Sequence, residues 1–167
     1  MLDVEDAREL QAAVLALKAM DRTLVRDINR DTRSVLNGPW QQEVKSRART
    51  TMDSRVLATG ARIKAGNPPV AVAASSTRAI GKSRRLKPAE HWQGYEFGSD
   101  RNAYSRYTGT SPKGKKYPVA RRTTRHLPPR TRQGRVVYPA FAAIAPRAVE
   151  LWLQTIVRKT YDAFEGK

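Results

Sequence analysis

The stretch that decides the fold is Val136–Phe164, VVYPAFAAIAPRAVELWLQTIVRKTYDAF, near the C-terminal end of the 167 residues. Its apolar side chains return every three or four residues, at Phe141, Ile144, Ala148, Trp152 and Ile156. This spacing is that of one helix face, so the stretch predicts a closing helix with one buried side.

The residues at the start of this stretch leave two questions open. Pro146 is either the first helical residue, after a looser turn over 139–145, or a kink inside a longer helix. The four residues Arg135–Tyr138, RVVY, are β-branched and aromatic, which predicts a short strand that leads into the helix. We therefore expect the helix to pack across a small sheet.

At the other end of the chain, residues 2–36 predict one long helix. Its stripe consists of Leu10, Val14, Leu17, Leu24, Ile28 and Val35. Asn37-Gly38 is typical of a helix C-terminus, and Pro39 is typical of a first helical residue. We expect a second helix from Pro39 to about Met52.

Between the helices, short segments predict a sheet. Residues 61–64 read as a strand, and residues 70–77 read as a second strand, with helix as the alternative because of their alanine content. Residues 91–98, HWQGYEFG, predict a third strand on which Glu96 faces outward. The side chains expected in the core are Trp92, Phe97, Phe141 and Trp152.

The expected fold class is α+β, with a long N-terminal helix and a C-terminal helix packed on a small, mainly antiparallel sheet. Residues 1–167 form one domain in this interpretation. It divides into N-terminal helices (1–53), a sheet region (54–99), a long basic loop (100–135), and a strand with the closing helix (136–167).

The net charge of +17 is concentrated in the middle of the chain. Residues 54–149 carry 20 Lys/Arg and three Asp/Glu, whereas the charges of the two flanks cancel. From Arg101 to Arg135 there are 11 basic residues and no acid, which predicts a long loop or a hairpin excursion. Such a segment either meets a negatively charged partner or is a solvated basic surface.

Catalytic and metal sites find little support in the sequence. There is no cysteine, and His91 and His126 are 35 residues apart without a cluster of ligands. Residues 109–115, GTSPKGK, have the spacing of a phosphate-binding loop, but Lys116 stands where Ser or Thr should hold magnesium. We expect no enzyme activity, no cofactor and no metal; we also expect no signal peptide and no membrane span.

The order of these parts resembles a family of long-tailed bacteriophages, the head–tail joining proteins of the neck, also described as tail-completion proteins. The resemblance rests on Tyr95-Glu96-Phe97-Gly98-Ser99, on Pro139-Ala140-Phe141 and on Pro146-Arg147-Ala148. Asn37-Gly38-Pro39-Trp40 is similar to members from phages of actinobacteria. The chain departs from the pattern by its basic insertion at 100–135 and by the residues between Phe141 and Pro146.

The resemblance implies a structural protein of the virion that forms a ring in the neck, such as a stopper or tail-completion ring, without catalysis. The implied partners are further copies in a hexamer or dodecamer, the portal-side adaptor or connector, and the tail terminator or tail tube. Double-stranded DNA would pass through the channel or be retained in it, with contacts to its backbone. During assembly the protein would lie in the host cytoplasm.

Two uses of the basic loop follow. At its tip, Lys113, Lys115 and Lys116 are candidates for the DNA channel, because they could neutralise phosphates. The remainder of the loop is expected to dock on an adjacent ring. Its docking candidates are Tyr104, Tyr107, Tyr117, Arg121, Arg122 and Arg125. The alternative to a neck ring is a sequence-nonspecific nucleic-acid-binding protein of another class.

Overall fold

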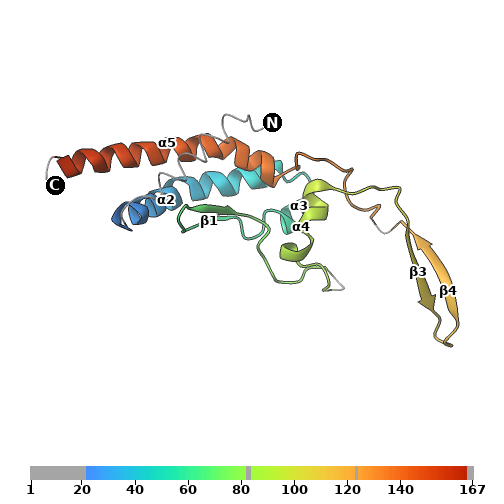
Figure 1. The fold of residues 1–167 in the computed structure, drawn as a ribbon. Coiled ribbons are helices and arrows are strands. Elements are labelled where there is room, and N and C mark those ends of the chain that lie inside the picture. Colours follow the sequence, from blue (N-terminus) through green and yellow to red (C-terminus); the bar gives the residue numbers. More distant parts are fainter. Residues whose placement is uncertain (1–21, 82–83, 123, 165–167) are drawn as a thin grey trace.

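Two long helices lie side by side and form the upper layer of a helical body (Figure 1). The structure is a computed structural model and describes residues 22–81, 84–122 and 124–164. Helix α2 spans Arg22–Arg47 and helix α5 spans Val137–Phe164. The part of the long N-terminal helix expected before residue 22 lies outside the described residues.

The two helices run antiparallel and are joined by apolar and polar contacts. Trp152 packs on Ile28 in the core, and its indole nitrogen donates to Thr32 Oγ1 at 2.8 Å. Near the end of α5, Lys159 lies 3.2 Å from Asp27. The hydrogen bond from Lys159 holds the pKa of Asp27 below its ordinary value, against the effect of burial.

Helix α2 continues through the predicted stop at Asn37-Gly38, and Pro39 lies inside it. The expected break was therefore wrong. Leu36, Trp40 and Val44 are buried at intervals of four residues, so one continuous apolar stripe crosses the proline. Tertiary packing of this stripe outweighs the local helix-breaking preference.

Helix α5 is also longer than expected at its start. The strand predicted at Arg135–Tyr138 is wrong, because α5 begins at Val137 and passes through Pro146. Pro146 is thus an interior residue and not the first residue of the helix. The part Val137–Asp162 is long and apolar enough to cross a membrane by length and composition alone, a test that core helices of soluble proteins also pass.

A small sheet lies below the long helices. Strands β1 (Arg62–Lys64) and β2 (Val70–Val72) pair antiparallel, with Ile63 opposite Ala71. Residues 70–72 thus form the strand that was predicted for 70–77, over a shorter length. Helix α2 covers β1, since Asn37 Oδ1 accepts the amide proton of Ile63 at 2.9 Å.

Two short helices complete the body: α3 (Thr51–Val56) and α4 (Pro88–Phe97). The strand predicted at 91–98 is therefore wrong. Pro88 occupies the first turn of α4, a position that suits proline because no amide donor is needed there. Trp92 is partly buried and Tyr95 is buried, which is the three-residue step of a helix.

The main core lies between the long helices, the sheet and α4. Of the predicted core residues, Trp152 is buried, whereas Trp92, Phe97 and Phe141 are half-buried. The ring of Phe97 lies 6.0 Å from that of Trp92 and 5.2 Å from that of Tyr138. These rings line the boundary at which the basic segment leaves the body.

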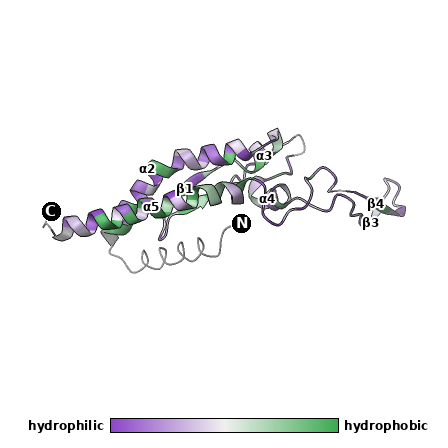
Figure 2. Ribbon diagram, turned by 90° about the horizontal axis from the view of Figure 1, so that it is seen from above, coloured by the Kyte–Doolittle hydropathy of each residue, from purple (hydrophilic) through white to green (hydrophobic). Residues whose placement is uncertain are grey.

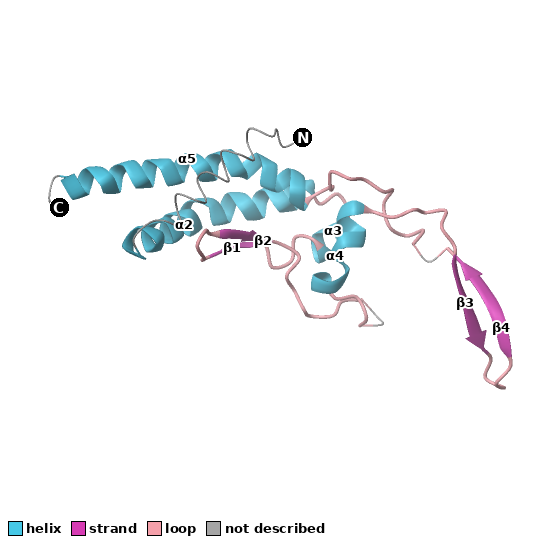
Figure 3. Ribbon diagram, viewed as in Figure 1, coloured by secondary structure: helices cyan, strands magenta, loops and turns pink. Residues whose placement is uncertain are grey.

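Residues 99–134 extend away from the body, and we call them the basic arm (Figures 1 and 3). Its strands β3 (Ser105–Thr110) and β4 (Lys116–Arg121) form an antiparallel hairpin. The hairpin alternative for the basic insertion is thus confirmed. Apolar residues gather in the body, whereas the connections to the hairpin are mainly hydrophilic (Figure 2).

Candidate interface on the basic arm

The base of the arm is held by Glu96, at the end of α4. Its side chain is fully buried, and its carboxylate accepts the backbone amides of Arg135 at 3.0 Å, Val136 at 3.2 Å, and Val137 and Tyr138 at 3.1 Å. These donors open helix α5 and have no partner within the helix. A negative charge is also favourable at a helix N-terminus. The outward-facing Glu96 expected from a strand was wrong.

Arg135 adds a second link at the base. Its guanidinium lies 3.4 Å from the carboxylate of Asp53 and donates to the carbonyl of Tyr95 at 3.1 Å. Asp53 is buried and also forms a capping box with Thr50 at the start of α3. Burial, together with the nearby Asp53 charge, raises the pKa of the Tyr95 hydroxyl. The base therefore joins α3, α4 and α5.

Two glycines allow the chain to leave and re-enter the body at the same place. Gly98 and Gly134 have φ of 68° and 72°, a region that residues with a side chain rarely adopt. A Cβ at Gly98 would collide with the carbonyl oxygen of Pro129, and one at Gly134 would collide with Glu96. The two ends of the arm are hydrogen-bonded, since Ser99 donates to Pro128 at 3.0 Å.

Between the base and the hairpin, side chains bond to the backbone of the opposite segment. Thr124 Oγ1 donates to the carbonyl of Asp100 at 3.0 Å, and Arg101 Nε donates to the carbonyl of Arg125 at 3.2 Å. The side chain of Arg125, one of the docking candidates, is exposed in this segment. These bonds fix the path of the two segments between the base and the hairpin, and they leave the charged groups of these segments in solvent.

The tip of the hairpin is a tight turn that uses its own backbone donors. The amide of Gly114 donates to the Ser111 carbonyl at 2.9 Å, and the amide of Lys115 donates to Ser111 Oγ at 3.1 Å. Strand β4 follows this turn, whereas a phosphate-binding loop leads into a helix. Residues 109–115 therefore form the end of β3 and the hairpin turn that follows it.

One face of the hairpin is aromatic. Paired residues of an antiparallel ladder share a face, so Tyr107, Gly109, Tyr117 and Val119 lie together; we call them the aromatic face. A Cβ at Gly109 would lie 2.9 Å from the Tyr117 ring and 3.0 Å from Val119, which places both side chains over the glycine. The two tyrosines are about half exposed, so this apolar surface faces solvent.

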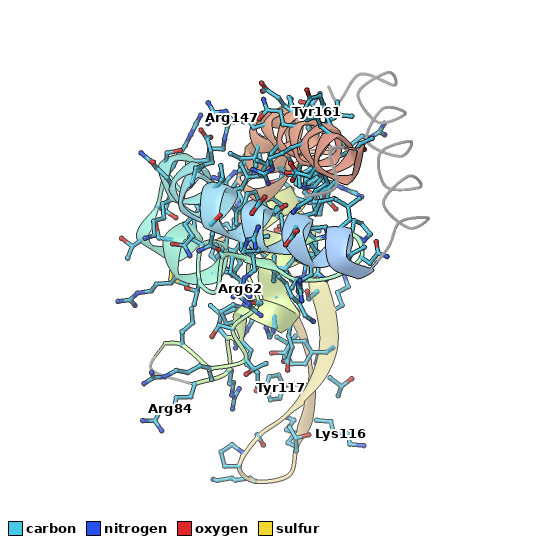
Figure 4. All side chains as sticks on the ribbon, turned by 90° about the vertical axis from the view of Figure 1, so that its left-hand side faces the viewer. Arg62, Arg84, Lys116, Tyr117, Arg147 and Tyr161 are labelled. Carbon is cyan, nitrogen blue, oxygen red and sulfur yellow. The ribbon has the colours of Figure 1, made fainter. Side chains whose placement is uncertain are left out.

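The opposite face carries cations and hydroxyl groups. We call it the cationic face, and it consists of Tyr104, Arg106, Thr108, Thr110, Lys116 and Arg122. The guanidinium of Arg122 lies 4.8 Å from the centre of the Tyr104 ring, a cation–π contact. Lys116 and Tyr117 are neighbours at the start of β4, on the hairpin that lies away from the helices (Figure 4).

The arm has almost no acid of its own and receives none from the body. Residues 99–134 contain ten Lys/Arg and one acid, Asp100. Among residues 22–81, 84–122 and 124–164, none of these ten cations forms an ion pair with a carboxylate. The carboxylates of Asp27, Asp53 and Glu96 are occupied by partners in the body. The charge of the arm is therefore uncompensated.

The structure brings some predicted site residues together and separates others. Lys113, Lys115 and Lys116 lie together at the tip of the hairpin, as a group of exposed cations. The three predicted docking tyrosines are divided, because Tyr107 and Tyr117 lie on the aromatic face and Tyr104 on the cationic face.

The predicted arginines are divided in a similar way. Arg121 pairs with Ser105 at the end of β4, on the side of the aromatic face, and Arg122 stacks on Tyr104 on the other side. Sequence reasoning missed Arg106 and the base residues Asp53 and Glu96. The alternation of side chains along a strand, which places Arg106 on the same face as Tyr104 and Thr108, could have identified Arg106. The buried carboxylates have no local pattern that would reveal them.

A second exposed apolar surface lies on the outer side of α5. Leu153, Val157 and Tyr161 follow each other at intervals of four residues, with 53%, 67% and 64% of their surfaces exposed. A stripe of this kind is typical of a contact with another helix or subunit. Tyr161 is labelled near the helix end in Figure 4.

No group of three or more His, Cys, Asp or Glu side chains that could hold a metal occurs in the part of the chain that the structure describes. Comparison with models of known protein families, with curated proteins and with solved structures gives no match.

Proposed function

We propose that this chain is a structural protein of a bacteriophage neck, without catalytic activity, that forms a homo-oligomeric ring between the DNA-filled head and the tail. The basic arm supports this proposal most strongly. It extends from the body with both faces exposed, and an isolated two-stranded hairpin is marginally stable in water. The arm is thus built to meet another surface.

In this proposal the subunits form a hexameric or dodecameric ring. The outer stripe Leu153, Val157 and Tyr161 offers an apolar contact for a neighbouring subunit. The aromatic face of the arm, with Tyr107 and Tyr117, docks on a neighbouring ring, on the side of the portal adaptor or of the tail terminator. The tip lysines Lys113, Lys115 and Lys116 face the DNA in the channel, where a cationic lining suits a polyanion.

A second candidate function is supported by the same charge distribution. A sequence-nonspecific nucleic-acid-binding protein would also carry ten uncompensated cations on an exposed hairpin. The two functions differ in location: a neck protein remains in the virion, whereas a protein of the second class binds nucleic acid in the cell.

The deciding experiment is complementation of particle assembly. Phage particles made without this chain should accumulate as filled heads and separate tails, and the purified chain should restore joined, infectious particles. Mass spectrometry of purified particles should then find the chain, and electron microscopy with a labelled version should place it at the neck. Joined particles that form without the chain would refute the proposal.

A variant pair tests the role of the aromatic face in this assay. Tyr107→Ser with Tyr117→Ser should abolish joining, because the exposed aromatic contact is removed. As the control, Val35→Ser with Met52→Ser removes two exposed apolar side chains from the body, outside the arm and the outer stripe of α5. If the control pair abolishes joining and the arm pair does not, the docking surface lies on the body instead.

A further inference from the structure

We propose that the cationic face of the arm binds the phosphate backbone of double-stranded DNA along its whole length, as a β-ribbon. This goes beyond the proposed function, in which DNA contacts belong to the lysines of the tip. It does not require a ring, because a single arm carries all the groups involved. Three features of the hairpin support this inference: its register, its distribution of charge and the shape of its surface.

The register places cations at both ends of one face. Lys116 pairs with Thr110 near the tip, whereas Arg106 pairs with Ala120 closer to the base. Arg122 continues the same face beyond the paired strands, where it stacks on Tyr104. Six residues of extended strand separate Lys116 from Arg122, which is about 20 Å. Duplex DNA presents about a dozen phosphates over this length.

The residues between these cations suit contact with phosphates. Thr108 and Thr110 are exposed on this face, and hydroxyl groups are common donors to phosphate oxygens. Pro118 and Ala120, on the partner strand, are small and keep the surface flat. No acid occurs in strands β3 and β4. The face therefore carries no charge that would repel a polyanion.

The shape of the arm agrees with this partner. A two-stranded β-ribbon fits the major groove of B-form DNA, whose width is about 12 Å. The residues Tyr104 to Arg122 contain no Asn, Gln, Asp or Glu, so part of the set of side chains that reads bases is missing. We therefore expect binding that depends on charge and is indifferent to sequence.

The contrast between the two faces argues against a protein partner for the cationic face. Protein interfaces are usually depleted of charge at their centres and enriched in aromatic residues. The aromatic face has that character, with Tyr107 and Tyr117. On the cationic face, Tyr104 is the one aromatic residue, and its exposed ring lies against the guanidinium of Arg122. An acidic protein surface is the competing partner that the experiment must exclude.

The test measures binding of the purified full chain to a fluorescent 30-base-pair duplex by anisotropy, over a series of salt concentrations. The face variant is Arg106→Ser with Lys116→Ser and Arg122→Ser. The matched control removes three exposed cations of the body: Arg33→Ser with Arg49→Ser and Arg55→Ser. Both variants lose the same net charge, so a difference between their affinities for the duplex depends on where the removed cations lie.

Three lost phosphate contacts should reduce the slope of log affinity against log salt by about 2.7, which corresponds to about 100-fold weaker binding near 0.15 M salt. The body control should keep the slope of the unchanged chain. Because the serine variant could disturb the hairpin, a second variant, Arg106→Lys with Arg122→Lys, keeps the charge and should keep the slope.

Three outcomes would overturn the inference: equal losses in the face variant and the body control, an unchanged slope in the face variant, or a loss of slope in the lysine variant. Strong binding to an acidic polypeptide such as poly-glutamate, with weak binding to the duplex, would also overturn it and favour a protein partner. Failure here with intact particle assembly leaves the neck function standing. Successful DNA binding by a chain that is absent from particles refutes the neck function alone.

Discussion

Replacing Glu96 by alanine removes a buried carboxylate that accepts four backbone amides at the start of α5. The substitution leaves these donors without an acceptor in a region closed to solvent, since Glu96 is fully buried. The perturbation acts on the junction of α4, α5 and the arm at once. It should therefore destabilise the body as well as the arm.

The magnitude follows from the number and kind of these bonds. Hydrogen bonds to a charged group contribute about 1.5–3 kcal/mol each, so four of them would sum to about 6–12 kcal/mol. Fraying of the first turn of α5 lets water reach some of the donors, and single substitutions rarely exceed about 4–5 kcal/mol. We expect Glu96→Ala to lower the free energy of unfolding by about 4 kcal/mol. Glu96→Gln, which keeps one acceptor oxygen, should cost about 2 kcal/mol.

The assay is urea denaturation at pH 7, with linear extrapolation to water. Glu90→Ala is the matched control, because Glu90 lies on the same helix but is exposed and bonds only to Lys87, at 2.8 Å, among the described residues. Its denaturation midpoint should not change. Hydrogen exchange at the amides of 135–138 should accelerate in Glu96→Gln and stay slow in the control.

A loss of less than about 1 kcal/mol in Glu96→Ala would refute the reasoning, since it would mean that water satisfies the four donors at no cost. Equal losses in Glu96→Ala and Glu90→Ala would refute it in another way. The effect would then come from helix α4 itself and not from the junction with α5.

Three further predictions test the body, the base and the buried tyrosine. Trp152→Ala should lower stability by about 3–5 kcal/mol in thermal denaturation, because the buried ring and its bond to Thr32 are lost; no change would contradict its place in the core. Gly98→Ala should cost more than Gly114→Ala in the same assay, since both glycines have positive φ but a Cβ meets a backbone carbonyl only at Gly98; equal costs would argue against a crowded base. The pKa of Tyr95 is raised in the folded protein, so its contribution to stability is present below the unfolded pKa of about 10 and is lost as pH rises through the folded value. Tyr95→Phe should therefore flatten the fall of stability above pH 10. Identical curves of stability against pH for the two proteins would refute this.

The α+β class and the two long helices could be predicted from the sequence because their evidence is periodic. The spacing of Leu36, Trp40 and Val44 and that of Ile144, Ala148 and Trp152 carry the helix period regardless of context. The break expected at Gly38-Pro39 was a local rule that the packing of this stripe outweighs. The spacing of apolar residues therefore predicted the extent of this helix better than the presence of glycine and proline did.

Helix α4 and the base of the arm could not be predicted, because their stabilising contacts are remote in sequence. The aromatic residues of 91–98 indicated a strand, but Glu96 binds amides about 40 residues away, at Arg135 to Tyr138. Those amides belong to the segment RVVY, whose two valines and tyrosine by themselves also indicated a strand. Each segment forms a helix in the presence of the other.

The two faces of the arm depend on the hairpin register, which the sequence left open. A shift of the pairing by one residue would place Tyr107 opposite a residue of the other face and mix cations with aromatic rings. Gly109 favours the observed pairing, because its missing side chain leaves room for the ring of Tyr117 and the methyl groups of Val119. The composition predicted a basic excursion, but only the pairing shows which cations share a surface.

The meeting of the two arm ends at the base has a consequence for how such a chain can change in evolution. The amide of Thr131 donates to the carbonyl of Phe97 at 2.8 Å, so the whole insertion is a loop whose two ends are joined at the body. The entropy of closing a loop grows slowly with length, by about 0.6 kcal/mol for each doubling. The arm can therefore be lengthened, shortened or exchanged as a cassette with little effect on the body, provided that Glu96, Gly98, Gly134 and Arg135 remain. A lineage could thus change its reach and its partner without redesigning its fold.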